Sequence, residues 1–252
     1  MTPRGRDGAW ALVTGAGRRL GRTLAIAAAQ AGYHLLIHHR GAPGDAAETL
    51  RLVRDSGREG LILAADLSDP GAASDLIGHS GGPLTLLVNC ASIFGDDTIQ
   101  TLTAESLDAH WAVNLRAPVL LSQAFAAALP PGRDGLIVNI ADQRVWRLTP
   151  RHFSYTLTKA ALWTATQTLA QALAPRVRVN AIGPGPTLAS SHQKPEEFAA
   201  EASAVPLGRG PHPEEIGQAL RYLIDAPSVT GQMIAVDGGQ HLAWRTPDVI
   251  GG

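Results

Sequence analysis

The chain has 252 residues, of which 45% are hydrophobic and 17% are charged, so it is long enough to bury a substantial core. Its formal net charge of −1 argues against nucleic acid or an anionic membrane as the main partner, since both need a basic face. The single cysteine, Cys90, excludes an internal disulfide and fits a reducing compartment. Residues 1–10 hold no secretion signal and no apolar run is long enough to span a bilayer, so we expect a cytoplasmic protein.

Short apolar runs alternate along the chain with longer segments of helical period. The expected strands lie at 9–14, 34–39, 60–65, 84–89, 135–140, 177–182 and 233–237. The expected helices lie at about 22–31, 45–56, 70–78, 103–129, 153–174 and 213–225. Thr103 is expected as an N-cap, and Pro213 as a first helical residue. This alternation predicts an α/β fold, a doubly wound parallel sheet of about seven strands with helices on both faces.

Residues 183–212 interrupt this rhythm, because they are rich in proline, glycine and serine between a strand and a helix. A connection this long in a compact domain is usually a functional lid or a disordered stretch. Its position after the carboxyl end of a strand favours a lid, since open α/β sheets bind ligands at that edge. We therefore expect a single domain at 1–252, with a substrate lid at about 183–212.

The first strand runs into a glycine-rich turn, TGAGRRLG at 14–21, which a helix follows. Glycines permit positive φ and let the backbone approach a pyrophosphate, which then sits at the helix N-terminus. A tight strand–helix connection is the alternative interpretation. The strand before the turn and the helix after it favour a Rossmann-type dinucleotide site.

The end of the second strand distinguishes NAD from NADP. An NAD site usually places an acidic residue there, but this chain has HHR at 38–40 and no carboxylate until Asp45. Arg40 can hold a 2′-phosphate through its planar donor fork, helped by Arg18 in the turn; the alternative is a solvated arginine. We expect NADP(H). Asp66, which closes the third strand, is placed to meet the adenine, or simply caps the next turn.

Tyr155 and Lys159 are four residues apart at the start of an expected helix, so they share one face. A tyrosine is a poor acid–base group at neutral pH unless a nearby cation stabilises the phenolate, and a lysine one turn away supplies that cation. An incidental pair on a solvated helix is the alternative. Asn114, in an otherwise apolar stretch, is either a satisfied core residue or a ligand for a water at a kink.

These elements together resemble the short-chain dehydrogenase/reductase family over nearly the whole chain. The matching pieces are TGxxxxxG at 14–21, Asp66, Asn89-Cys90-Ala91-Ser92, Asn114, Tyr155-x-x-x-Lys159, Pro184-Gly185 and VDGG at 236–239. The resemblance implies a Rossmann sheet, NAD(P)H, and Tyr155 as proton donor with its pKa lowered by Lys159. It also implies that Asn114 supports a water chain to the lysine. A homodimer or homotetramer through the helices at 103–129 and 153–174 is implied too, with intramolecular packing of those helices as the alternative.

The chain departs from the family where substrate chemistry is decided. Asp142 stands where most family members have a serine that donates a hydrogen bond to a substrate carbonyl. An ionised aspartate accepts hydrogen bonds but cannot donate them. It therefore suits a substrate that has N–H groups, or one whose nitrogen must be protonated. A surface aspartate, with Thr149 or Ser154 in the serine's role, is the alternative. Arg19 replaces a turn glycine and would face the pyrophosphate. Cys90 is interpreted as a small buried filler.

Asp142, Arg19 and Phe94 together resemble the pteridine reductases of this family. That resemblance implies a pterin between Phe94 and the nicotinamide, with Arg19 bridging its carbonyl edge and the pyrophosphate. Ser92 would contact the cofactor, and Asp142 would position Tyr155 and the proton supply. The leading hypothesis is an NADPH-dependent reductase of a C=N bond in a dihydropterin or related folate. The alternatives are a reductase of another small carbonyl or imine, and a non-catalytic NADPH- or pterin-binding regulator.

The residues expected at the site fall into three overlapping sets, with no metal. The catalytic residues are Asp142, Tyr155, Lys159 and Asn114. The cofactor-binding residues are Gly15, Arg18, Arg19, Leu20, Gly21, His39, Arg40, Asp66, Leu67, Asn89, Ala91, Ser92, Tyr155, Lys159, Pro184 and Gly185. The substrate-binding residues are Arg19, Phe94, Asp142 and Tyr155.

Overall fold

A computed structural model describes residues 8–190 and 193–244. Within them, seven strands form one parallel sheet in the order β3-β2-β1-β4-β5-β6-β7. The strands are β1 (Trp10–Val13), β2 (His34–His39), β3 (Gly60–Ala64), β4 (Leu84–Asn89), β5 (Gly135–Ile140), β6 (Val177–Pro184) and β7 (Met233–Val236). The expected doubly wound sheet is thereby confirmed, with each strand within a few residues of its predicted bounds.

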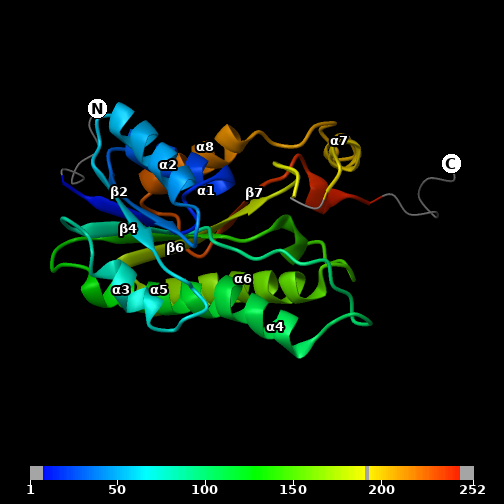
Figure 1. Ribbon diagram of the computed structural model, residues 1–252, viewed down its shortest axis with the longest axis horizontal. Helices are drawn as coiled ribbons and strands as arrows, with labels where there is room; N and C mark the ends of the chain where they lie inside the picture. The colour runs from blue at the N-terminus through cyan, green and yellow to red at the C-terminus, as the bar shows by residue number, and fades with distance from the viewer. Residues whose placement is uncertain (1–7, 191–192, 245–252) are drawn as a thin grey trace, which may run out of the picture.

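Helices cover both faces of this sheet (Figure 1). The first face carries α1 (Arg19–Gln30), α2 (Pro43–Asp55) and α8 (Pro213–Asp225). The second face carries α3 (Ala72–Ile77), α4 (Ala104–Trp111), α5 (Ala117–Ala128) and α6 (Phe153–Leu173). None of the helices within the described residues is both long and apolar enough to cross a membrane.

Alternate residues of each strand supply two separate cores. In β1, Ala11 and Val13 pack on the side of α1 and α8, while Trp10 and Leu12 pack on the side of α5. Because both faces are covered, the central strands are apolar at nearly every position, as the sequence pattern indicated. The strand order reverses between β1 and β4, so a ligand-binding crevice is expected at the carboxyl ends of these two strands.

The helix expected at 103–129 is divided in the structure. Thr103 caps α4 as predicted, its hydroxyl oxygen accepting from the Ser106 amide at 3.1 Å. A π-helical turn, Ala112–Arg116, then separates α4 from α5. Such turns are rare and often lie at functional sites. The turn carries Asn114, whose side-chain contacts are described below.

The segment expected as an irregular lid contains a helix that the sequence reading missed. Strand β6 extends to Pro184, and α7 (Pro195–Ser203) lies within the remaining lid segment, residues 185–212, of which 191–192 fall outside the described residues. Pro195 occupies the first turn of α7, as Pro213 does in α8. In Figure 1, α7 stands beyond the end of β7, apart from the helices that cover the sheet. The lid segment is therefore partly ordered by its own helix.

Candidate active site

A cleft of about 730 Å³ opens at the carboxyl ends of the central strands. The loops after strands β1 to β6 contribute to its floor, and the lid segment forms one wall. All of the site residues predicted from the sequence line this cleft except His39, Asn89 and Asn114. Residues that are far apart in the chain are thus brought together in the crevice that the strand order predicts.

The glycine-rich turn is packed too closely for side chains at two positions. A Cβ on Gly21 would lie 2.0 Å from the carbonyl oxygen of Gly15, and a Cβ on Gly15, where φ is +66°, would lie 3.0 Å from the Cα of Ala91. The backbone amides at the start of α1 are therefore reachable by a ligand in the cleft, and an anionic group is favoured there. This geometry fits the pyrophosphate of a dinucleotide.

Two side chains that the sequence reading did not assign hold this turn in place. The Thr14 hydroxyl oxygen accepts hydrogen bonds from the amides of Cys90 (2.9 Å) and Ala91 (3.0 Å), which joins the ends of β1 and β4. His38 is buried and its Nδ1 accepts from the Gly15 amide at 3.0 Å, while Nε2 donates to the Ala65 carbonyl at 3.1 Å. Burial lowers the pKa of His38, in keeping with a neutral ring.

His39 points away from the cleft that its neighbours line. Its Nδ1 accepts from the amides of Gly41 (3.1 Å) and Ala42 (3.2 Å), because successive side chains of a strand alternate between faces. His38 and Arg40 line the cleft in its place. The prediction that His39 contacts the cofactor is therefore not supported by this geometry.

The nucleotide end of the cleft carries exposed arginines. Arg18 and Arg40 both line it, and they are suited to a phosphate group. Asp66 accepts from the Ser68 amide at 2.8 Å, so it does cap the next turn while still lining the cleft. The hydrogen bonds from Ser68, and more weakly the charge of Arg40, hold the pKa of Asp66 below its ordinary value.

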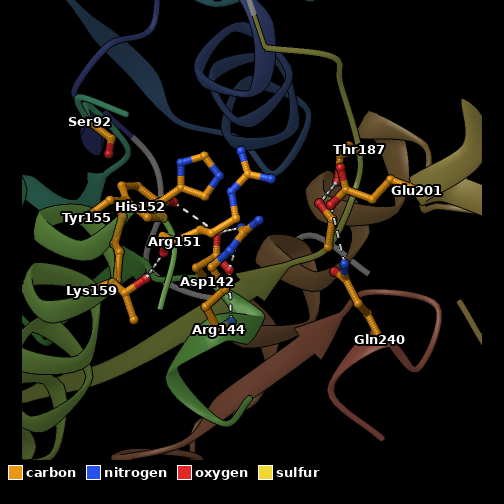
Figure 2. Close-up of polar contacts among 12 residues, drawn as sticks. Ser92, Asp142, Arg144, Arg151, His152, Tyr155, Lys159, Thr187, Glu201 and Gln240 are labelled. Atoms are coloured by element: carbon orange, nitrogen blue, oxygen red, sulfur yellow. Dashed lines mark hydrogen bonds and ion pairs between the residues drawn. The ribbon is translucent and has the colours of Figure 1, made fainter. Parts of the chain in front are cut away.

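At the other end of the cleft, Tyr155 and Asp142 form a direct hydrogen bond. The buried Tyr155 hydroxyl donates to Oδ2 of Asp142 at 2.9 Å (Figure 2). Asp142 also accepts from the backbone amide of Arg144 at 2.8 Å and from its guanidinium at 3.3 and 3.4 Å. Asp142 is therefore an acceptor for the Tyr155 hydroxyl, and it is also paired with a cation, Arg144, that the sequence did not point to.

The electrostatics of Tyr155 differ from those that the family resemblance implied. Burial and the Asp142 carboxylate raise the pKa of Tyr155 well above its ordinary value, and the charge of Arg144 acts against them. Lys159 lies 5.5 Å from the centre of the tyrosine ring and donates to the Ile140 carbonyl at 2.6 Å. Burial lowers the pKa of Lys159 to about 8. The charge of Arg144, which the sequence did not point to, therefore favours the ionised form of Tyr155.

Asn114 is a fully satisfied buried residue. Its side-chain oxygen accepts from the Ile93 amide (2.8 Å) and the Ser92 hydroxyl (3.1 Å). Its amide donates to the Ile93 carbonyl (3.0 Å) and the Thr158 hydroxyl (3.3 Å). Asn114 therefore fixes the loop that carries Ser92 against α6, although its own side chain does not line the cleft.

The side chain of Asn89 is hydrogen-bonded inside the sheet and does not line the cleft. Its amide donates to the side chain of Asn139 at 2.8 Å, and Asn139 in turn donates to the Thr166 hydroxyl at 2.9 Å. This buried chain of hydrogen bonds ties β4 to β5 and α6. The prediction of a direct cofactor contact by Asn89 is therefore not supported by the geometry.

Phe94 forms an exposed aromatic surface beside Tyr155. Its ring meets Tyr155 edge-on at 4.8 Å and stacks with a tilt on His152 at 4.4 Å, yet 38% of the residue stays exposed in the cleft. An offset-stacked or edge-on arrangement of this kind suits a flat heterocycle. Cys90 behaves as the expected filler, because burial raises the pKa of its thiol to about 11 and makes it a poor nucleophile.

The lid wall contributes polar groups that the sequence reading did not assign. The Arg19 guanidinium donates to the Leu188 carbonyl at 3.2 Å, which joins the nucleotide turn to the lid segment. Glu201 of α7 accepts from the side-chain amides of Gln193 (2.9 Å) and Gln240 (3.3 Å), and all three residues line the cleft. We call Glu201, Gln193 and Gln240 the Glu201 cluster.

Comparisons with known proteins agree with this site. The family model described as enoyl-(acyl carrier protein) reductase matches residues 15–241. L-xylulose reductase from Bos taurus is 34% identical over 238 residues, covering 91% of this chain and 95% of that protein. The chain therefore belongs to the short-chain dehydrogenase/reductase family, whose members are oxidoreductases that use NAD(P)(H).

Two solved structures are more similar still. Alternative dihydrofolate reductase 1 (FolM) from Brucella suis, in complex with NADP, is 47% identical with a TM-score of 0.91 and covers 96% of this chain and 98% of its own. The corresponding protein from Brucella canis, also complexed with NADP, is 46% identical with a TM-score of 0.92 and covers 98% of this chain and 100% of its own.

Proposed function

We propose that this chain is an NADPH-dependent reductase that reduces the C=N bond of a dihydropterin or a related dihydrofolate. The observation that carries the proposal is the hydrogen bond from Tyr155 to Asp142, at the position where a carbonyl reductase of this family has a hydroxyl donor. An ionised carboxylate repels a carbonyl oxygen but accepts the N–H groups that a pterin presents. The names of the two Brucella proteins support the same substrate class.

NADP(H) is the proposed cofactor, with its pyrophosphate at the turn of Gly15 and Gly21 and its 2′-phosphate near Arg18 and Arg40. When bound, the nicotinamide supplies the hydride. Lys159 keeps a buried positive charge beneath the Tyr155 ring, suited to a ribose hydroxyl and to the tyrosine oxygen. The lid segment and the turn are proposed to close over both molecules.

The chain's own residues then have to deliver one proton to the substrate nitrogen. The substrate carbon receives the hydride while the adjacent nitrogen takes the proton of the Tyr155 hydroxyl, so that C=N becomes CH–NH. Asp142 and Arg144 hold that hydroxyl in place and set its acidity. Proton transfer by a positioned group typically contributes ~10²–10⁴-fold to the rate. Phe94 supplies the surface on which a flat ring is held for the transfer.

A second candidate is reduction of a small sugar-like carbonyl, because L-xylulose reductase is among the relatives. The Asp142 carboxylate opposes it, for the reason given above. A non-catalytic binding protein is a weaker candidate, since it has no need of a buried tyrosine beside a buried lysine. By family resemblance we also propose a cytoplasmic homodimer or homotetramer.

The test is a steady-state assay with NADPH or NADH and 7,8-dihydrobiopterin, following loss of the absorbance of the reduced nicotinamide. We expect turnover with a preference for NADPH, no turnover in Tyr155→Phe, and a strong loss in Asp142→Ser. Tyr222→Phe, at an exposed tyrosine, is the matched control and should retain activity. Turnover of L-xylulose without turnover of the dihydropterin would refute the proposed substrate class.

A further inference from the structure

The Glu201 cluster places an unneutralised carboxylate on the substrate side of the cleft. Within the described residues, both Glu201 oxygens accept from neutral amides, and no arginine or lysine lies within ion-pair distance. A carboxylate has about four acceptor positions, and the two amides occupy only two of them. The remaining positions are free to accept from a ligand in the cleft that Glu201 lines.

The amides also fix where this carboxylate points. Gln193 precedes α7, Glu201 lies in its last turn, and Gln240 follows β7, so three separate segments meet at one side chain. Figure 2 shows Glu201 and Gln240 on one side of the site, with Asp142 and Arg144 between them and the Tyr155–Lys159 pair. Glu201 is thus held across from the catalytic groups and not folded away into solvent.

The proposed substrate directs its side chain toward this wall. In a 7,8-dihydropterin the reduced bond joins N5 to C6, and C6 carries the side chain. With Tyr155 as the donor to N5 and the nucleotide at Gly15 and Arg40, the lid segment is the remaining wall of the same cleft, and we place the C6 side chain against it. There it meets the Glu201 cluster and the apolar ring of Phe198.

We infer that the Glu201 cluster is a specificity subsite that accepts a neutral, hydroxyl-bearing side chain on the substrate and disfavours one that carries carboxylates. This inference rests on the proposed function and narrows it. A hydroxyl donates to the Glu201 carboxylate, which is a charge-assisted hydrogen bond. The glutamate arm of a folate carries two negative charges and meets a like charge in the same wall.

The experiment compares three pterins of matched ring: 7,8-dihydrobiopterin, 7,8-dihydrofolate, and the dimethyl ester of 7,8-dihydrofolate. In the wild type we expect kcat/KM to fall in the order dihydrobiopterin, ester, acid. In Glu201→Gln, kcat/KM for dihydrobiopterin should fall roughly tenfold, as for loss of a hydrogen bond to a charged group. The preference for ester over acid should shrink by about fivefold, the size of one partly exposed charge pair.

Glu196→Gln, on the exposed first turn of the same helix, is the control and should leave all three values unchanged. The Kd for NADPH of the Glu201→Gln variant should equal that of the wild type, which would show that the lid segment is still folded. An ester-to-acid ratio that is the same in Glu201→Gln and the wild type would overturn the inference while the proposed function stands. Failure of the wild type to reduce any of the three would refute the proposed function, and the inference with it.

Discussion

Replacing Lys159 by methionine tests the electrostatics of the candidate active site through protein stability, without any substrate. Lys159 is buried, 2% exposed, and burial lowers its pKa from the ordinary 10.5 to about 8. Below pH 8 the lysine is protonated in both the folded and the unfolded chain, and the folded chain bears the cost of burying the charge. Between pH 8 and 10.5 the unfolded chain binds the extra proton, so stability rises with pH by about 1.4 kcal/mol per unit.

The methionine variant lacks this titration, so the comparison isolates one group. From pH 7 to pH 9 the wild type should gain about 1.4 kcal/mol in free energy of unfolding relative to Lys159→Met. Burial raises the pKa of the Cys90 thiol from the ordinary 9.0 to about 11, so both proteins lose some stability as the pH rises toward and past 9. Because burial, the main cause, is the same in both proteins, most of this loss cancels from the difference. The assay is urea unfolding at pH 7, 8 and 9.

Lys194→Met, at the exposed start of α7, is the control and should show no such gain. Lys159→Met should also abolish turnover while leaving the protein folded. A difference in unfolding free energy that stays constant from pH 7 to pH 9 would refute the reasoning, because it would mean that Lys159 is not a buried cation with a lowered pKa.

Three further substitutions probe groups that surround the site. Thr14→Val leaves the two amides of the β4 loop without an acceptor, and urea unfolding should show a loss of about 2–4 kcal/mol that Thr14→Ser largely restores. Arg144→Met removes the charge that lowers the pKa of Tyr155, so kcat should fall roughly tenfold in steady-state assays with little change in KM, whereas the exposed Arg147→Met should behave as wild type. Arg40→Ala should raise the KM for NADPH by roughly 10–100-fold and leave that for NADH unchanged; equal effects on both would contradict a 2′-phosphate contact.

The fold was predictable because its signals are local. Each central strand is a short apolar run buried on both faces, and the helices between them carry recognisable starts. Helix α7 also has a recognisable start in the sequence, because PEE at 195–197 repeats the three residues that begin α8 at 213–215. It was missed because α7 buries none of its residues and so shows no apolar stripe.

Which residues meet in the cleft was predictable where residue type and spacing form a recognisable motif. The glycine turn and the Tyr155–Lys159 pair are of this kind, since both line the cleft. The contacts of Asn114 are not, because its partners Ile93 and Thr158 lie 21 and 44 residues away in the sequence. Arg144 was missed for a different reason: it lies only two residues after Asp142, but the sequence does not show that its guanidinium turns back onto the carboxylate that also accepts from Tyr155.

The backbone of Arg19 has a consequence for how this protein can be engineered. Its φ of 55° lies in the left-handed region that glycine adopts freely and that costs other residues about 1 kcal/mol or more. Glycine at this position would relieve that backbone strain at the cost of a more flexible unfolded chain. The same change would remove the guanidinium that reaches Leu188 across the cleft. Arg19 thus combines a backbone conformation that favours glycine with a side-chain contact that glycine cannot make.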